Sequence, residues 1–64
     1  MKTRRWARRE VERSLNNLGW AFLHLDRVYE KYKGYDENID KLLESAFVLL
    51  GMTDEVLKKL LEIL

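Results

Sequence analysis

The chain has 64 residues, enough for one domain, and a monomer of this size buries only a small core. It has no cysteine, which excludes disulfides, and only one histidine, which does not suffice for a structural metal site. Oligomerisation or close helix packing must therefore supply stability. Charged residues make up 36% of the chain, a bias typical of proteins from hot environments, yet the net charge is +1. The sequence has neither a secretory leader nor the roughly 20 apolar residues of a membrane span, so we expect a cytoplasmic protein.

The first half of the chain carries apolar residues alternately four and three positions apart, which predicts one long helix over residues 3–33. The row consists of Val11, Leu15, Leu18, Phe22, Leu25, Tyr29 and Tyr32. Such a helix would be about 45 Å long, too long for a compact three-helix fold. We therefore expect it to pair with another long element.

The second half predicts two shorter helices. Gly34 ends the long helix, and Asp36 is a suitable N-cap for a helix that ends near Leu50. Gly51 is suited to the position after a helix, and Thr53 to the N-cap of a third helix over residues 54–63. Because the apolar rhythm continues across Gly51, an alternative is one helix kinked at this glycine.

The predicted fold is all-α, a single domain over residues 1–64 in which the two shorter helices return antiparallel to the long one. Residues 1–9 form a basic N-terminal arm, which we expect to fray. Residues 18–25 are apolar around nearly the whole helix, which is typical of a buried helix. We therefore expect a homodimer with a four-helix-bundle-like core. The predicted oligomer interface comprises Leu18, Gly19, Trp20, Phe22, Leu23 and Leu25. The alternative is that Gly19 bends the long helix over its own return arm.

Six of the twelve Lys and Arg residues lie in the first thirteen positions, opposed there only by Glu10 and Glu12. Arginines near a helix N-terminus meet the positive end of its dipole, so folding does not favour them. Their four-residue spacing suits a row of phosphates, and the segment is similar to arginine-rich RNA-binding helices over about ten residues. The predicted DNA or RNA contacts are Arg4, Arg5, Arg8, Arg9 and Arg13, with Trp6 stacking on a base.

Other interpretations of these surfaces remain open. The arginines could form a solubilising arm paired with acidic residues, or could bind an acidic protein partner; a membrane surface is less favoured. Alternatively, the chain is a protein-interaction or inhibitor module that acts through an apolar face around Trp20, Leu23 and residues 57–64. Phosphate binding should weaken with salt, whereas apolar association should not.

Little in the sequence points to catalysis, a metal or a cofactor. His24 has no partner ligands, and Ser14 lies about 15 Å from it along one helix, so the two form no triad with Asp26. A helix-turn-helix motif around Gly51 is disfavoured because its recognition helix would open with two acidic residues. We therefore expect a binding protein and not an enzyme.

Overall fold

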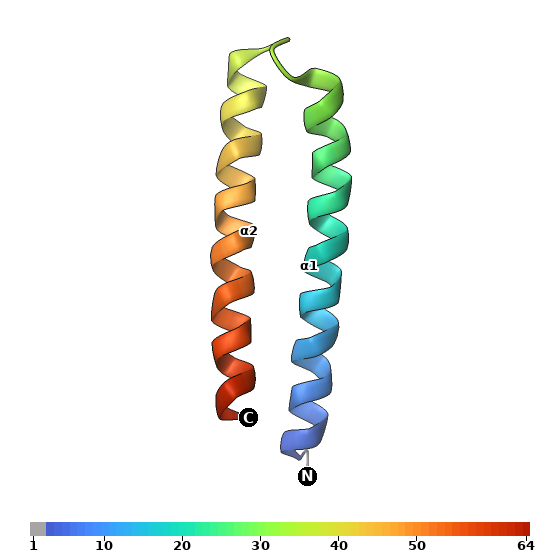
Figure 1. Ribbon diagram of the computed structural model, residues 1–64, viewed down its shortest axis with the longest axis vertical. Helices are drawn as coiled ribbons and strands as arrows, with labels where there is room; N and C mark the ends of the chain where they lie inside the picture. Colours follow the sequence, from blue (N-terminus) through green and yellow to red (C-terminus); the bar gives the residue numbers. More distant parts are fainter. Residues whose placement is uncertain (1–2) are drawn as a thin grey trace.

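The computed structural model describes residues 3–64, which form an antiparallel helical hairpin (Figure 1). Helix α1 spans Arg4–Tyr32 and helix α2 spans Glu37–Ile63. The hairpin is a rod of 50 × 16 × 15 Å. The chain begins and ends at one end of this rod, and the connecting turn lies at the other (Figure 1).

The turn between the helices forms as the sequence predicts. Gly34 has a φ of +75°, in the left-handed region that glycine adopts readily, and its N–H donates to Asp40 Oδ2 at 3.1 Å. Asp36 then caps α2, because its side chain accepts hydrogen bonds from the backbone N–H groups of Asn38 and Ile39. A left-handed glycine and an aspartate N-cap therefore reverse the chain.

The helices meet along one apolar row from each, here called the seam. Its α1 side consists of Val11, Leu15, Leu18, Phe22, Leu25 and Tyr29, and its α2 side of Ile39, Leu43, Ala46, Leu50, Leu57, Leu60 and Leu64. Beside the seam, the rings of Phe22 and Phe47 stack with centroids 6.2 Å apart. Among the described residues, only Leu43 is buried, at 8% exposure; the other seam residues are half-buried. Two helices alone thus enclose very little core.

The prediction of three helices is wrong, because α2 continues without interruption through Gly51. Thr53 is not an N-cap: its hydroxyl donates to the carbonyl of Leu49, one turn earlier in the same helix, at 2.9 Å. A glycine that ends a helix usually takes a positive φ, and Gly51 does not. The apolar row continues on both sides of Gly51, so packing against α1 outweighs the cost of about 1 kcal/mol of a glycine within a helix.

The long first helix was predicted almost to the residue. Thr3 caps it by accepting a hydrogen bond from the backbone N–H of Trp6 at 3.2 Å. The basic arm, where fraying was expected over residues 1–9, is helical from Arg4 onward, and Met1 and Lys2 lie outside the described residues. The structure contains one chain, so dimerisation stays a prediction.

Candidate nucleic-acid interface

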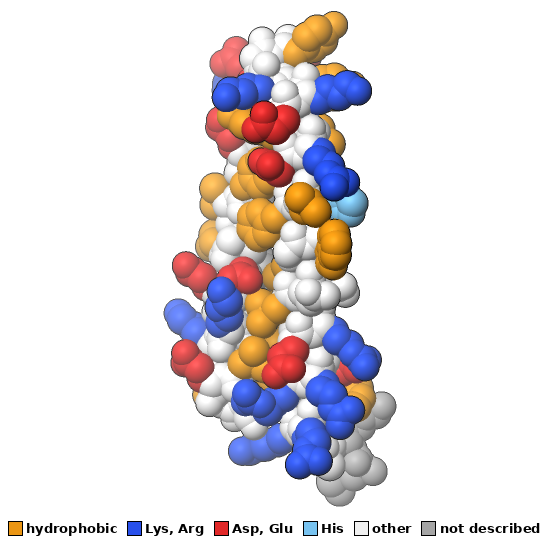
Figure 2. Space-filling view, turned by 45° about the vertical axis from the view of Figure 1, so that its right-hand side comes forward, with side chains coloured by type: hydrophobic (Ala, Val, Ile, Leu, Met, Phe, Trp, Pro, Cys, Tyr) orange, Lys and Arg blue, Asp and Glu red, His pale blue; other side chains and the backbone are white. Residues whose placement is uncertain are grey.

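The predicted phosphate contacts lie at the open end of the hairpin, where α1 begins beside the last turn of α2 (Figure 1). Figure 2 shows basic side chains gathered at this end, with acidic ones among them. The N-terminus of α1 adds a partial positive charge of about half a unit, and the C-terminus of α2 adds a partial negative one. Whether this end can bind an anion therefore depends on which arginines already have a partner within the chain.

Arg8 neutralises the end of α2. Its Nη1 donates to the backbone carbonyl of Leu61 at 2.6 Å. The last turn of α2 has no basic residue of its own, and its final carbonyls lack partners within the helix. The guanidinium from α1 therefore caps the C-terminus of α2, a structural role that the sequence analysis did not foresee.

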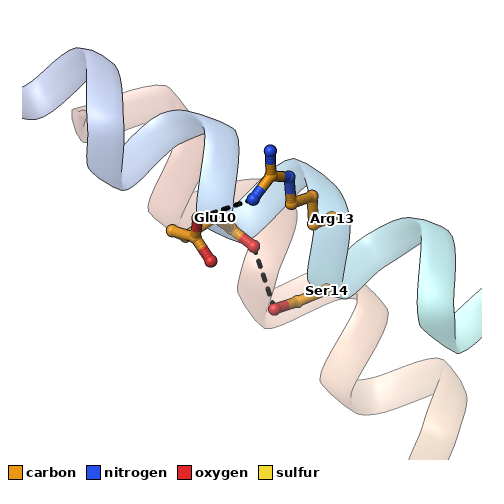
Figure 3. A network of polar contacts seen from close by, with 3 residues as sticks. All are labelled: Glu10, Arg13 and Ser14. Carbon is orange, nitrogen blue, oxygen red and sulfur yellow. Dashed lines mark hydrogen bonds and ion pairs between the residues drawn. The ribbon is translucent and has the colours of Figure 1, made fainter.

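Arg13 is held within its own helix. Its Nη1 lies 3.1 Å from Oε1 of Glu10, one turn earlier, as Figure 3 shows. Both side chains reach solvent, so this ion pair contributes at most about 1 kcal/mol, and Arg13 can exchange Glu10 for another anion. Arg13 is thus available to a phosphate at little energetic cost.

Arg4, Arg5 and Arg9 have no acidic partner among residues 3–64. All three are exposed on the first two turns of α1. Trp6 lies between them in the sequence, and its side chain is 44% exposed. The available cations of the basic end are therefore Arg4, Arg5 and Arg9, together with the weakly paired Arg13; these four residues are called the basic end below.

The predicted oligomer interface divides into two parts in the structure. Leu18, Phe22 and Leu25 face α2 within the same chain. Trp20 is 56% exposed and stacks on His24, with ring centroids 6.3 Å apart. The remaining residues, Leu23 and Gly19, are also exposed, and no side chain lies within 4 Å of where a Cβ of Gly19 would be. Three of these residues thus build the hairpin, and three remain on its surface.

Helix α2 carries a second apolar row that was not predicted from the sequence. It consists of Leu42, Leu49, Val56 and Ile63, here called the apolar flank, each at least 63% exposed. These residues recur every seven positions, one position before Leu43, Leu50, Leu57 and Leu64 of the seam. The spacing is present in the sequence, but only the row that became the seam was interpreted as an apolar face of this helix.

The side of the hairpin opposite the apolar flank carries acidic groups. A shallow groove there is lined by Phe22, Leu23, Asp26, Tyr29, Glu44 and Phe47. Within residues 3–64, no group of three or more His, Cys, Asp or Glu side chains is placed to hold a metal ion. Neither described helix has a stretch both long and apolar enough to cross a membrane. This groove thus pairs two carboxylates with aromatic rings and shows no further binding groups.

The pKa of Lys58 is clearly perturbed. Asp54 Oδ2 accepts a hydrogen bond from Lys58 Nζ at 2.8 Å, and this bond with the carboxylate charge raises the pKa of Lys58 above its ordinary 10.5. The side chain of Lys58 is 65% exposed, so the pair is a surface feature of α2.

Comparison of the chain with protein-family models, with curated proteins and with solved structures finds no match. The function must therefore be inferred from the surfaces described above.

Proposed function

We propose that this protein is a small dimeric nucleic-acid-binding protein that contacts phosphates through its basic end. The observation that carries the proposal is that Arg4, Arg5 and Arg9 stand on the first turns of α1 without an acidic partner in residues 3–64. These arginines neither stabilise the fold nor form ion pairs with described residues, so binding of an external anion would account for their presence.

The geometry favours a polyanion over a single small anion. Arg5 and Arg9 are four residues apart and lie on one face of α1, whereas Arg4 lies about 100° around the helix from Arg5. The three arginines are therefore spread along and around the first turns, and a single small anion is not expected to meet all of them. A backbone with many phosphates can meet them separately, and binding then gains free energy from released counterions. Trp6 adds a ring that can stack on an unpaired base.

Dimerisation would strengthen this binding. Two basic ends in one particle raise the effective concentration of the second once the first has bound. A basic end with only three arginines that lack an acidic partner gains most from such doubling.

Fluorescence anisotropy tests the proposal. Labelled duplex DNA, single-stranded DNA and structured RNA are titrated with the protein at low and at physiological salt. We expect binding that weakens with salt, with a slope that falls by about 0.9 for each duplex phosphate contact removed. The combined substitutions Arg4→Gln, Arg5→Gln and Arg9→Gln should abolish it.

A matched variant separates the basic end from net charge. Arg27→Gln, Lys31→Gln and Lys33→Gln remove the same charge near the turn of the hairpin. This variant should bind as the wild type does at physiological salt. Equal loss in both variants, or no binding to any of the three nucleic acids at low salt, would contradict a specific basic end.

A protein-interaction module acting through an exposed apolar face is the second candidate. The observation that favours it is the number of large apolar side chains left in solvent, Trp20 and the apolar flank among them. Such binding would be nearly independent of salt, so the same titration series distinguishes the two functions.

A further inference from the structure

From the apolar flank we infer that two copies of this chain pack face to face through the flank and the adjoining side of α1. The two hairpins point in the same direction, with their turns at the same end of the dimer. The inference rests on the dimer proposed above and names its interface; it is independent of phosphate binding. The occupant of the flank is a second copy of the chain, for three reasons.

The first reason is surface area. The hairpin exposes 5488 Å², whereas a folded monomer of 7.7 kDa is expected to expose about 4,300 Å². The excess is about 1,200 Å² per chain, and two copies hiding it would bury roughly 2,300 Å², within the range of permanent homodimers. One chain therefore carries about the surplus surface that a stable dimer requires.

The second reason is the shape of the side of α1 that adjoins the flank. Ala7, Ser14, Ala21 and Val28 each directly precede a residue that faces α2, just as the flank residues precede seam residues. In two antiparallel helices that face each other, equivalent positions lie on the same side of the pair. The face thus has a row of mostly small side chains on α1 and a row of large ones on α2.

The register of the hairpin places these two rows level with each other. The contacts of Arg8 with Leu61 and of Phe22 with Phe47 fix this register. The resulting level pairs are Ala7 with Ile63, Ser14 with Val56, Ala21 with Leu49, and Val28 with Leu42. If a second hairpin packs in the same direction, α1 of one copy meets α2 of the other, and each small side chain opposes a large one. In the opposite direction, large would meet large.

The polar groups along this face tolerate burial. Ser14 is the one polar residue in the α1 row, and its hydroxyl donates to the carbonyl of Glu10 at 3.0 Å (Figure 3). Its hydrogen bond is therefore made within the helix, and covering it leaves no unsatisfied donor. The side chain then acts as a small spacer.

The third reason is charge at the border of the face. Glu10 lies at the edge of the α1 row, and Lys59 at the edge of the flank. They occupy the same level of the rod, so packing in the same direction brings Glu10 opposite Lys59 of the partner subunit. Packing in the opposite direction would set α1 against α1 and α2 against α2, which separates Glu10 from Lys59 of the partner subunit and loses this attraction.

Sedimentation equilibrium of adjacent substitutions tests the interface. Leu49 and Val48 are 63% and 62% exposed, but only Leu49 lies on the flank. We expect the wild type and Val48→Lys to have twice the chain mass of 7.7 kDa. Leu49→Lys should raise the dimer dissociation constant by at least about a hundredfold, because each copy would bury an unpaired charge.

A distance measurement in the otherwise unchanged chain tests the direction and does not depend on a disruptive variant. The chain has no cysteine, so Tyr35→Cys gives one spin-label site, in the turn, where the side chain is 83% exposed. Packing in the same direction places the two labels within about 25 Å, a few interhelical spacings. A separation near the 50 Å length of the rod would overturn this direction.

The outcomes separate the interface from the function. A wild-type monomer would overturn the interface and the proposed dimer together. Dimers retained in Leu49→Lys but lost in Trp20→Lys would overturn this interface and leave the dimer intact. Neither result depends on the nucleic-acid titration, whose failure would remove only the phosphate contacts.

Discussion

Helix α2 carries two apolar rows that run along its whole length and differ mainly in what covers them. The seam row faces α1 and contains Leu43, which is 8% exposed. The flank row begins one residue earlier with Leu42, which is 72% exposed. Their compositions are similar, since both consist mostly of leucine and other aliphatic residues.

A helix with two apolar rows about a quarter-turn apart needs neighbours on two sides, as in a four-helix bundle. The side of α2 beyond the seam does not share this character, because Asp40 and Asp54 alternate there with Phe47 and Leu61. The single hairpin thus satisfies one apolar row and leaves one, which indicates half of a bundle.

Truncating one residue of each row should give the largest difference between them. Leu43→Ala should cost about 2–5 kcal/mol, most of the stability of so small a fold. Leu42→Ala should leave the folded hairpin unchanged and weaken only the dimer. Thermal unfolding followed by circular dichroism at dilute concentration measures the difference, and equal losses would show that the rows are not distinct.

Both rows depend on the turn at Gly34 and on an unbroken α2, and glycine substitutions test both. Gly34→Ala should destabilise by about 1–2 kcal/mol because alanine resists the positive φ of the turn. Gly51→Ala should stabilise by about 1 kcal/mol, since a Cβ there meets nothing within 4 Å and the helix continues through it. Denaturant unfolding would measure both, and a destabilising Gly51→Ala would indicate a break in the helix.

Arg8 links α1 to the end of α2 through its hydrogen bond to the carbonyl of Leu61, whereas Arg9 makes no such contact among the described residues. Arg8→Gln should lower the free energy of unfolding by about 1 kcal/mol, through loss of the cation at the C-terminus of α2. Arg9→Gln should leave stability unchanged and weaken nucleic-acid binding. Chemical denaturation combined with anisotropy measures both effects; if the two variants lose stability equally, Arg8 is not a cap.

The smallest expected effect concerns the acidic side of α2. Asp54→Asn should lower the pKa of Lys58 toward 10.5, because the hydrogen bond and the carboxylate charge that raise it weaken. A raised lysine pKa stabilises the folded chain below 10.5 and ceases to do so as the pH rises through the raised value. Titration of Lys58 by NMR measures this shift, and an unchanged pKa would exclude the pair.

Much of this fold was predictable from local chemistry. The seven-residue rhythm of Val11, Leu18 and Leu25 predicts α1, and a flexible glycine followed by Asp36 predicts the turn. Gly51 misled the prediction because a glycine only weakens a helix, and tertiary packing decides whether the helix ends there.

The candidate site was less predictable. The charges of Arg4, Arg5, Arg8 and Arg9 can be counted in the sequence, but which of them caps a helix depends on the register of the hairpin. The apolar flank required knowing which of two rows α1 covers. Both depend on contacts between residues far apart in the sequence, which local patterns do not encode.

The most direct test is the mass of the wild-type chain in solution at low and at high salt. Sedimentation equilibrium should give twice 7.7 kDa at both, because the inferred interface is largely apolar and salt screens only its charged border. A mass of 7.7 kDa at micromolar concentration, with the hairpin still folded, would show that the second apolar row needs no partner and would contradict the half-bundle.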